Sequence, residues 1–224
     1  MTAQGPRLVL LGKQGAGKGT QAARLADLFG TEHFSTGELF RAAAAEGTPA
    51  GIDAKRYMDA GELVPDETVI RLVEERFAED GPLDDGFVLD GFPRTLRQAV
   101  ALERVLADRP VELALDIEVP TDIVIDRIAR RRVCTDCGRN YHENFRPTVN
   151  WTCDNCGGPV VQRDDDTEEA VARRLELYDT QTVPIIEFYR GLDKLVVVDG
   201  IGDGDVVFDR LLKEIEGRLE HARR

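Results

Sequence analysis

The chain has 224 residues, of which 42% are hydrophobic and 32% charged, and this composition excludes collagen-like, disordered and low-complexity classes. Its 42 acidic residues outweigh 29 Lys and Arg, and a net charge of -13 disfavours a dedicated nucleic-acid binder because the phosphate backbone would be repelled. We find no stretch with the length and apolarity of a membrane span and no export signal, so we expect a cytoplasmic protein with no membrane partner.

The first predicted element is a buried strand, Arg7 to Leu11, followed by a glycine-rich loop and a helix. The loop, Gly12 to Lys18, has the spacing G-x4-G-K of a phosphate-binding loop (P-loop), in which backbone N–H groups, the helix N-terminus and the lysine ammonium surround phosphate oxygens. The flanking strand and helix favour this interpretation over a glycine turn with an incidental lysine. Gly19 replaces the usual Ser or Thr that binds magnesium, and the hydroxyl comes one residue later, at Thr20.

Residues 36–65 are alanine-rich and helical, with no pattern of a buried strand, and we interpret them as a lobe inserted into the core. A second strand, residues 86–89, ends in Asp90, where a carboxylate would lie beside the P-loop and could hold a magnesium ion or its waters. The alternative for Asp90 is an ordinary turn aspartate, and the phosphate loop upstream favours the functional reading.

The later elements repeat the alternation of strand and helix. A third strand, Val111 to Val119, precedes a helix expected from Asp122 to Arg132. Helical periodicity returns over residues 166–189, a fourth strand covers Leu195 to Val198, and an amphipathic helix over residues 205–220 closes the chain. Strands that are apolar on both faces and alternate with helices predict an α/β fold, a parallel sheet covered by helices on both faces.

Residues 133–165 are polar and turn-rich, and they contain every cysteine of the chain. The pattern Cys134-x2-Cys137-x15-Cys153-x2-Cys156 has the spacing of a tetrahedral zinc site, which we favour over four unrelated thiols. Four protein ligands leave no position for a water, so this metal would stabilise the segment and would not catalyse a reaction.

A group of arginines lies at or near the borders of the two inserted segments. Its members are Arg41, Arg94, Arg127, Arg131, Arg163 and Arg174. Each alone is typical of a solvated surface, but six in an acidic chain suggest a cage for several phosphates. The histidines, His142 among them, have no paired nucleophile, and we expect them to be surface or packing residues.

Several motifs together resemble a known family. They are GKQGAGKGTQ (12–21), STGELFR (35–41), LVPDE (63–67), GFVLDGFPRTLRQA (86–99), DRIARRRVC (126–134), RDDDTEEAVARRLELY (163–178) and VDG (198–200). In this order and spacing they resemble the bacterial adenylate kinases of the long, zinc-bearing lid type, among the nucleoside monophosphate kinases. The resemblance covers nearly the whole chain.

The resemblance implies reversible, Mg2+-dependent phosphoryl transfer, ATP + AMP giving two ADP, by a monomer that binds these nucleotides and carries a structural Zn2+. It implies a P-loop NTPase-type core formed by residues 1–35, 66–129 and 167–224, an NMP-binding lobe at 36–65 and a zinc-binding lid at 130–166.

The resemblance also implies roles for individual residues. Those assigned to catalysis are Lys18, Asp90, Arg94, Arg131, Arg163 and Arg174. Those assigned to ATP are Gly15, Ala16, Gly17, Lys18, Gly19, Thr20, Arg127, Arg131, Tyr141 and Gly202. Those assigned to AMP are Thr36, Arg41, Glu62, Leu63, Val64, Gly91, Phe92, Pro93, Arg94, Gln98, Arg163 and Arg174. The metal ligands would be Cys134, Cys137, Cys153 and Cys156.

Two positions depart from the family pattern: Gln14 stands where the loop often has proline, and Glu38 replaces the usual aspartate of STGD. Two alternative functions also stay open. One is a kinase whose acceptor is UMP, CMP or GMP, against which Gln98 and the long cysteine-bearing lid count. The other is a non-enzymatic zinc-ribbon module that binds nucleic acid, against which the net charge of -13 and Lys18 count.

Overall fold

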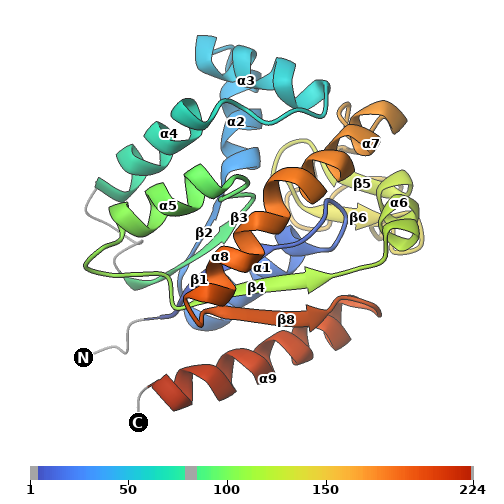
Figure 1. Ribbon diagram of the computed structural model, residues 1–224. Coiled ribbons are helices and arrows are strands. Elements are labelled where there is room, and N and C mark those ends of the chain that lie inside the picture. Colours follow the sequence, from blue (N-terminus) through green and yellow to red (C-terminus); the bar gives the residue numbers. More distant parts are fainter. Residues whose placement is uncertain (1–4, 79–84, 223–224) are drawn as a thin grey trace.

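The computed structural model describes residues 5–78 and 85–222, and a parallel five-stranded sheet lies at its centre (Figure 1). The strands are β1 (Arg7–Leu11), β2 (Glu32–Ser35), β3 (Phe87–Asp90), β4 (Leu113–Glu118) and β8 (Leu195–Asp199), in the order β2-β3-β1-β4-β8. All four neighbouring pairs are parallel, which confirms the expected α/β class. The strand β2 was not predicted.

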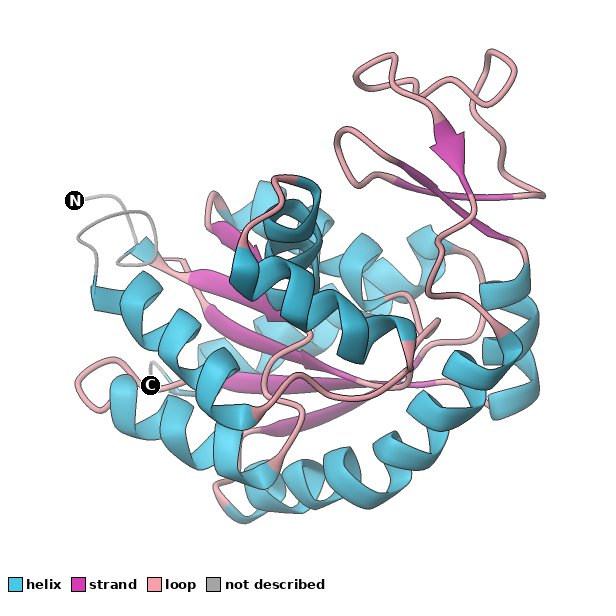
Figure 2. Cartoon of the chain, turned by 90° about the horizontal axis from the view of Figure 1, so that it is seen from above, coloured by secondary structure: helices cyan, strands magenta, loops and turns pink. Residues whose placement is uncertain are grey.

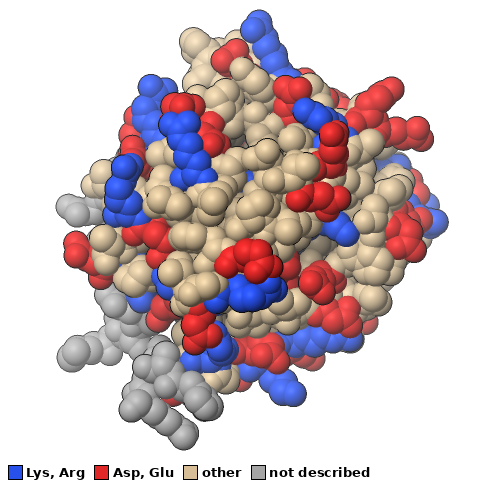
Figure 3. Space-filling model, in the orientation of Figure 1, with Lys and Arg blue, Asp and Glu red and all other residues tan. Residues whose placement is uncertain are grey.

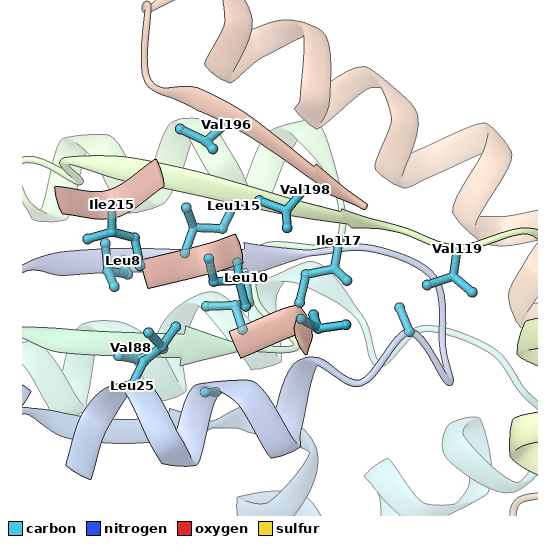
Figure 4. Close-up of a cluster of buried hydrophobic side chains, with 14 of the residues drawn as sticks. Leu8, Leu10, Leu25, Val88, Leu115, Ile117, Val119, Val196, Val198 and Ile215 are labelled. Atoms are coloured by element: carbon cyan, nitrogen blue, oxygen red, sulfur yellow. The ribbon is translucent and has the colours of Figure 1, made fainter. Parts of the chain in front are cut away.

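Helices cover both faces of the sheet. Successive side chains of each strand point to opposite faces, and since they are apolar on both sides, both faces must be buried. On β1, Leu8 and Leu10 belong to one buried cluster, while Val9 and Leu11 belong to the other. The first cluster is completed by α1 (Lys18–Phe29), α6 (Thr121–Ala129) and α9 (Gly204–Ala222), and Figure 4 shows part of it. The second is completed by α4 (Asp66–Ala78), α5 (Leu96–Val105) and α8 (Val183–Gly191).

A pair of helices, α2 (Thr36–Ala45) and α3 (Pro49–Asp59), follows β2. Each has a hydroxyl cap: the Ser35 side chain accepts from Glu38 N, and the Thr48 side chain accepts from Gly51 N. The two helices approach so closely at Gly51 that an added Cβ would lie 2.2 Å from a backbone carbon of Ala43. Only glycine fits this crossing.

A second, antiparallel sheet follows α6 and stands apart from the central one (Figure 2). It consists of β5 (Arg131–Cys134), β6 (Asn140–His142) and β7 (Val160–Val161), in the order β6-β5-β7. The helix expected to reach residue 132 therefore ends at Ala129, which corrects the sequence interpretation. The reason is the ladder with β6: Arg131, Arg132 and Val133 pair with the strand from Asn140 to His142.

The chain returns to the core through α7 (Glu168–Leu177) and one π-helical turn, Tyr178–Thr182, before α8. The Thr167 side chain caps α7 by accepting from Ala170 N, and Pro184 lies in the first turn of α8. Within the described residues, none of the helices has the length and apolarity needed to cross a membrane.

Candidate active site

The P-loop has the geometry of an anion-binding site at the start of a helix. Gly17 is the N-cap of α1 with φ of 98°, a conformation in which a side chain would be strained. The Lys18 ammonium donates to the carbonyl oxygens of Gly12 at 2.7 Å and Lys13 at 2.8 Å, which holds it over the loop. The loop therefore presents the helix N-terminus and one ammonium to the same space.

That space is a cavity of about 630 Å³ between the P-loop, the carboxyl end of β3, the helix α2, the small sheet and α7. Nineteen of the residues predicted for the site line it: Gly15, Ala16, Gly17, Lys18, Gly19, Thr20, Arg41, Glu62, Leu63, Asp90, Gly91, Pro93, Arg94, Arg127, Arg131, Tyr141, Arg163, Arg174 and Gly202. Segments far apart in the sequence thus meet around one cavity whose cations are mostly arginines.

Two of these arginines are held by consecutive buried aspartates that sequence reasoning did not assign. Arg131 forms a bidentate pair with Asp166, and its Nε lies 2.9 Å from Asp166 Oδ2. Arg174 donates to Asp165 Oδ2 at 2.6 Å and to the carbonyl oxygen of Met58 at 2.6 Å. The acidic run that directly follows Arg163 was the available signal, since carboxylates next to a group of arginines often orient them.

Burial and crowding shape the electrostatics of the cavity. Burial lowers the pKa of Lys18 to about 8, although the Asp90 carboxylate opposes that shift. Burial, reinforced by Arg174, lowers the pKa of Arg94 to about 10, and burial with Arg131 lowers that of Arg163 to about 9. Each of the three groups remains protonated at neutral pH but is repelled by neighbouring arginines, so an anion with several charges would relieve this repulsion.

The residues present fit a hydrated magnesium ion beside Lys18. Asp90 ends β3 at the cavity, and a Cβ added to Gly19 would lie 3.1 Å from Asp90 Oδ2. A serine or threonine at position 19 would press on this carboxylate, so the glycine keeps the space beside it open. A carboxylate oxygen that faces a phosphate site is the ligand that Mg2+ prefers.

Four of the residues predicted to bind nucleotides do not line the cavity. Thr36 is buried and donates to the carbonyl oxygen of Gly91 at 3.0 Å, and Phe92 belongs to the core. Val64 packs against the same core. Gln98 is 2% exposed; its Oε1 accepts from Arg94 N at 2.7 Å, and its Nε2 donates to Asp66 at 2.8 Å. In this structure Gln98 supports the backbone at Arg94, and its base-reading role stays a prediction.

The small sheet contributes aromatic and imidazole groups that were not all foreseen. His142 and Phe145 line the cavity, with ring centroids 6.2 Å apart, although His142 was expected only to pack or to face solvent. Phe145 is 71% exposed. Tyr141 lines the cavity too, but its hydroxyl lies 3.4 Å from Cys153 Sγ and accepts from Asp154 N. An exposed ring at the mouth of an anion site offers a stacking surface for a flat ligand.

The small sheet and α2 approach each other across the cavity. A Cβ added to Gly138 would lie 3.6 Å from Glu38 Oε1, so the turn that ends just after Cys137 and the first turn of α2 are neighbours. Glu38, one of the two departures from the family pattern, therefore lies at the point where the inserted segments meet.

The four cysteines form a compact cluster in which all Sγ atoms lie within 4.8 Å of one another. Two of the distances, Cys134 to Cys156 and Cys137 to Cys153, are 3.4 and 3.6 Å. Ligands about 2.3 Å from a zinc ion at the corners of a tetrahedron would be separated by about 3.8 Å, so the cluster fits such an ion. Each half closes with a matching turn, from Gly138 N to Cys134 O and from Gly157 N to Cys153 O.

Comparisons with known proteins identify the relatives of the chain. A sequence model described as "Adenylate kinase" matches residues 10–194. The chain is 47% identical to a protein named adenylate kinase from Clostridium novyi (strain NT), over 94% of this chain and 99% of the relative. It is 48% identical to an adenylate kinase from Geobacillus sp. (strain WCH70), over 95% of this chain and 99% of the relative. An adenylate kinase of Clostridium perfringens (strain SM101 / Type A) is also 48% identical, with coverage of 92% and 97%.

Proposed function

Since the chain belongs to the adenylate kinase family, we propose that its large cavity carries out reversible transfer of a phosphoryl group from MgATP to AMP, giving two ADP. As a member of this family it is a phosphotransferase of the nucleoside monophosphate kinase class. The observation that carries the proposal is the convergence of a strand–loop–helix anion site, Lys18 and several arginines on one cavity.

The reaction needs positioned positive charge more than acid–base chemistry. An oxygen of the AMP phosphate attacks the terminal phosphorus of ATP, and charge spreads over the transferring group in the transition state. Lys18 and Arg131 stabilise the donor phosphates, while Arg163 and Arg174 stabilise the negative charge of the phosphoryl group during its transfer. On the molecular face drawn in Figure 3, by contrast, Lys and Arg are interspersed with Asp and Glu.

The two nucleotides occupy opposite ends of the cavity. We place ATP along the P-loop, with its adenine beside Arg127, which donates to the carbonyl oxygens of Gly200 at 3.0 Å and Gly202 at 3.2 Å. AMP lies between α2 and the end of β3, where its phosphate meets Arg41 and Arg94. This arrangement brings the triphosphate of ATP and the phosphate of AMP together at Lys18.

Asp90 would hold the magnesium ion through water molecules. The bound ion supplies charge neutralisation of the ATP phosphates and fixes their orientation. Asp90 has a second function that needs no ion. Its carboxylate opposes the lowering of the Lys18 pKa by burial, which favours the charged ammonium.

Closure of the two inserted segments completes the site. Residues 36–65 act as the lobe for AMP and residues 130–166 as the lid for ATP, and the short approach between Glu38 and Gly138 supports their meeting over the substrates. Closure excludes water, so the phosphoryl group passes to AMP and is not lost by hydrolysis. The four cysteines of the lid hold a structural zinc ion that takes no part in the chemistry.

The proposal predicts a strong preference for AMP as acceptor. MgATP should be supplied with AMP, GMP, CMP or UMP, and ADP formation measured by a coupled assay. A pocket that hydrogen-bonds the adenine edge leaves polar groups unpaired with a wrong base, at about 1–3 kcal/mol each, so AMP should react at least tenfold faster. Equal rates would indicate a kinase without adenylate selectivity, and no turnover with any acceptor would overturn the proposed function.

A further inference from the structure

A hydrogen bond joins the P-loop to the segment that follows β7. Gln14 Nε2, in the loop, donates to Asp166 Oδ1 at 3.0 Å, and the two residues are 152 positions apart in the chain. Gln14 lines the cavity. It has no role in the reaction as described above, and it stands where the family pattern often has a proline, which offers no amide.

The carboxylate that receives this bond is the one that orients Arg131. Both Asp166 oxygens pair with the Arg131 guanidinium, and the Asp166 side chain is 0% exposed, against 16% for Arg131. Gln14, Asp166 and Arg131 therefore form a chain of three side chains with the buried Asp166 carboxylate at its centre. The pair uses one edge of the guanidinium and leaves the remaining donors of Arg131 for a phosphate.

We propose that Gln14 is a positioning residue for phosphoryl transfer: through Asp166 it fixes Arg131 in the orientation in which the guanidinium meets the phosphates bound on the P-loop. This inference rests on the proposed function. A carboxylate that receives a further donor is held more rigidly, and so is the arginine paired with it. Since Gln14 is part of the loop, the orientation of Arg131 becomes tied to the loop that binds the phosphates.

The unpaired oxygen atom of the Gln14 amide supports this positioning role. Gln14 Oε1 is buried and has no hydrogen-bond partner among the described residues, so the bond to Asp166 alone sets the orientation of the amide. An unpaired buried acceptor destabilises a protein. Such a group is retained where the residue serves the function of the site and does not serve the fold.

The test removes the amide group of Gln14 while keeping the length of the side chain. In Gln14→Met the side chain has nearly the same length but no donor, and we expect kcat to fall roughly threefold to tenfold, as for the loss of one supporting hydrogen bond. The KM for AMP should stay within about twofold, since Arg41 and Arg94 are not touched. Gln14→Ala should lower kcat to the same level as Gln14→Met.

The matched control is a glutamine-to-methionine substitution at an exposed position, Gln181→Met, which should leave kcat unchanged.

A double-mutant cycle separates this role from direct contact between Gln14 and a phosphate. In an Arg131→Ala background, Gln14→Met should have almost no further effect on kcat, because the residue through which it acts is gone. A full additional loss in that background would overturn the proposal, and so would normal kcat in Gln14→Met. Absence of ADP formation by the wild-type enzyme would instead refute the proposed function, so the two failures are distinguishable.

Discussion

At the scale of single residues, burial determines how the charged groups around the cavity behave. Lys18 lies at the start of α1 with its ammonium over the loop, and Arg94 lies in the loop that follows β3, where its Nε donates to the carbonyl oxygen of Gly91. Both have a pKa lowered by burial, and both face other cations. Their charge is therefore costly in the free enzyme and is stabilised when phosphates bind, which places their main contribution in substrate binding and in the transition state.

Lys18→Ala should lower turnover by on the order of a hundredfold or more, because it removes a positioned cation from the developing phosphate charge. The far-UV spectrum should remain close to that of the wild type, since the Lys18 side chain belongs to neither of the buried apolar clusters on the two faces of the sheet. Lys213→Ala, at an exposed lysine of α9, is the control. Near-normal turnover in Lys18→Ala would mean that the loop does not bind the reacting phosphates.

Asp116 is a buried carboxyl group that the reaction does not use. It lies in β4 with 1% exposure, and its Oδ1 accepts from the Tyr178 hydroxyl at 3.4 Å. Burial, reinforced by Glu118, raises its pKa from 3.8 to about 6. The folded state thus holds the proton more tightly than the unfolded state, so the group costs no stability below about pH 4 and progressively more as the pH rises to about 6.

Asp116→Asn should therefore stabilise the protein at neutral pH. The full effect, expected above about pH 6, is on the order of 2 kcal/mol, or several degrees in the melting temperature. The advantage should shrink on acidification and vanish near pH 4. Melting curves of both proteins from pH 4 to 8 provide the test. A constant difference between them, or a less stable variant at pH 8, would show that desolvation of this carboxylate is not the cause.

The sequence predicted the types of residue in the site better than their partners. The P-loop spacing and the recurring arginines were sufficient to predict the cationic groups that line the cavity. The aspartates that hold Arg131 and Arg174 were missed, because a sequence does not show which carboxylate faces which guanidinium. For the same reason, the sequence could not show that the amide of Gln98 bonds to Asp66 and the backbone of Arg94.

At the scale of elements, the lid segment depends on its cysteines. Its buried apolar cluster consists of Cys134, Cys153 and Val160, with Tyr141 and Trp151 packed against it. Such a core is too small to stabilise three short strands alone, so we expect metal coordination by the four cysteines to supply the remaining stability.

Purified protein should contain about one zinc ion per chain, the content of a single four-ligand site. The double variant Cys134→Ser with Cys153→Ser should lose this zinc and unfold its lid at a lower temperature. It should retain activity at moderate temperature, because no group that touches the phosphates is removed. Metal content, calorimetry and turnover at two temperatures provide the test, and wild-type protein treated with a chelator is the control. Unchanged melting combined with loss of turnover at every temperature would identify a catalytic metal.

Predictions of elements failed where tertiary pairing decided the outcome. The strand β2, with the sequence Glu-His-Phe-Ser, has too little apolar character to be recognised, yet it pairs with β3 from Glu32 to Ser35. The helix α6 ends three residues before the expected boundary, because Arg131 and Arg132 join the ladder with β6. The strand β2 is determined by a partner far along the chain, and β5 by antiparallel pairing across a turn, so local periodicity could reveal neither.

At the scale of the whole molecule, the order of the strands places the segments that form the site next to one another. In the order β2-β3-β1-β4-β8, the P-loop after β1 lies next to the end of β3, which carries Asp90. Parallel strands alternating with helices were predictable from apolar runs. The family resemblance implied a lobe and a lid that close over the substrates, but it could not show which residues meet, such as Glu38 and Gly138.

On the proposed function, one cavity binds two adenine nucleotides and exchanges a phosphoryl group between them. The most direct measurement supplies MgADP alone and follows the products by phosphorus NMR. Two ADP molecules bound in the ATP and AMP positions should give ATP and AMP in equal amounts, with no inorganic phosphate, because closure excludes water. A kinase for another acceptor would leave ADP unchanged, and a hydrolase would release phosphate; either result would contradict the account.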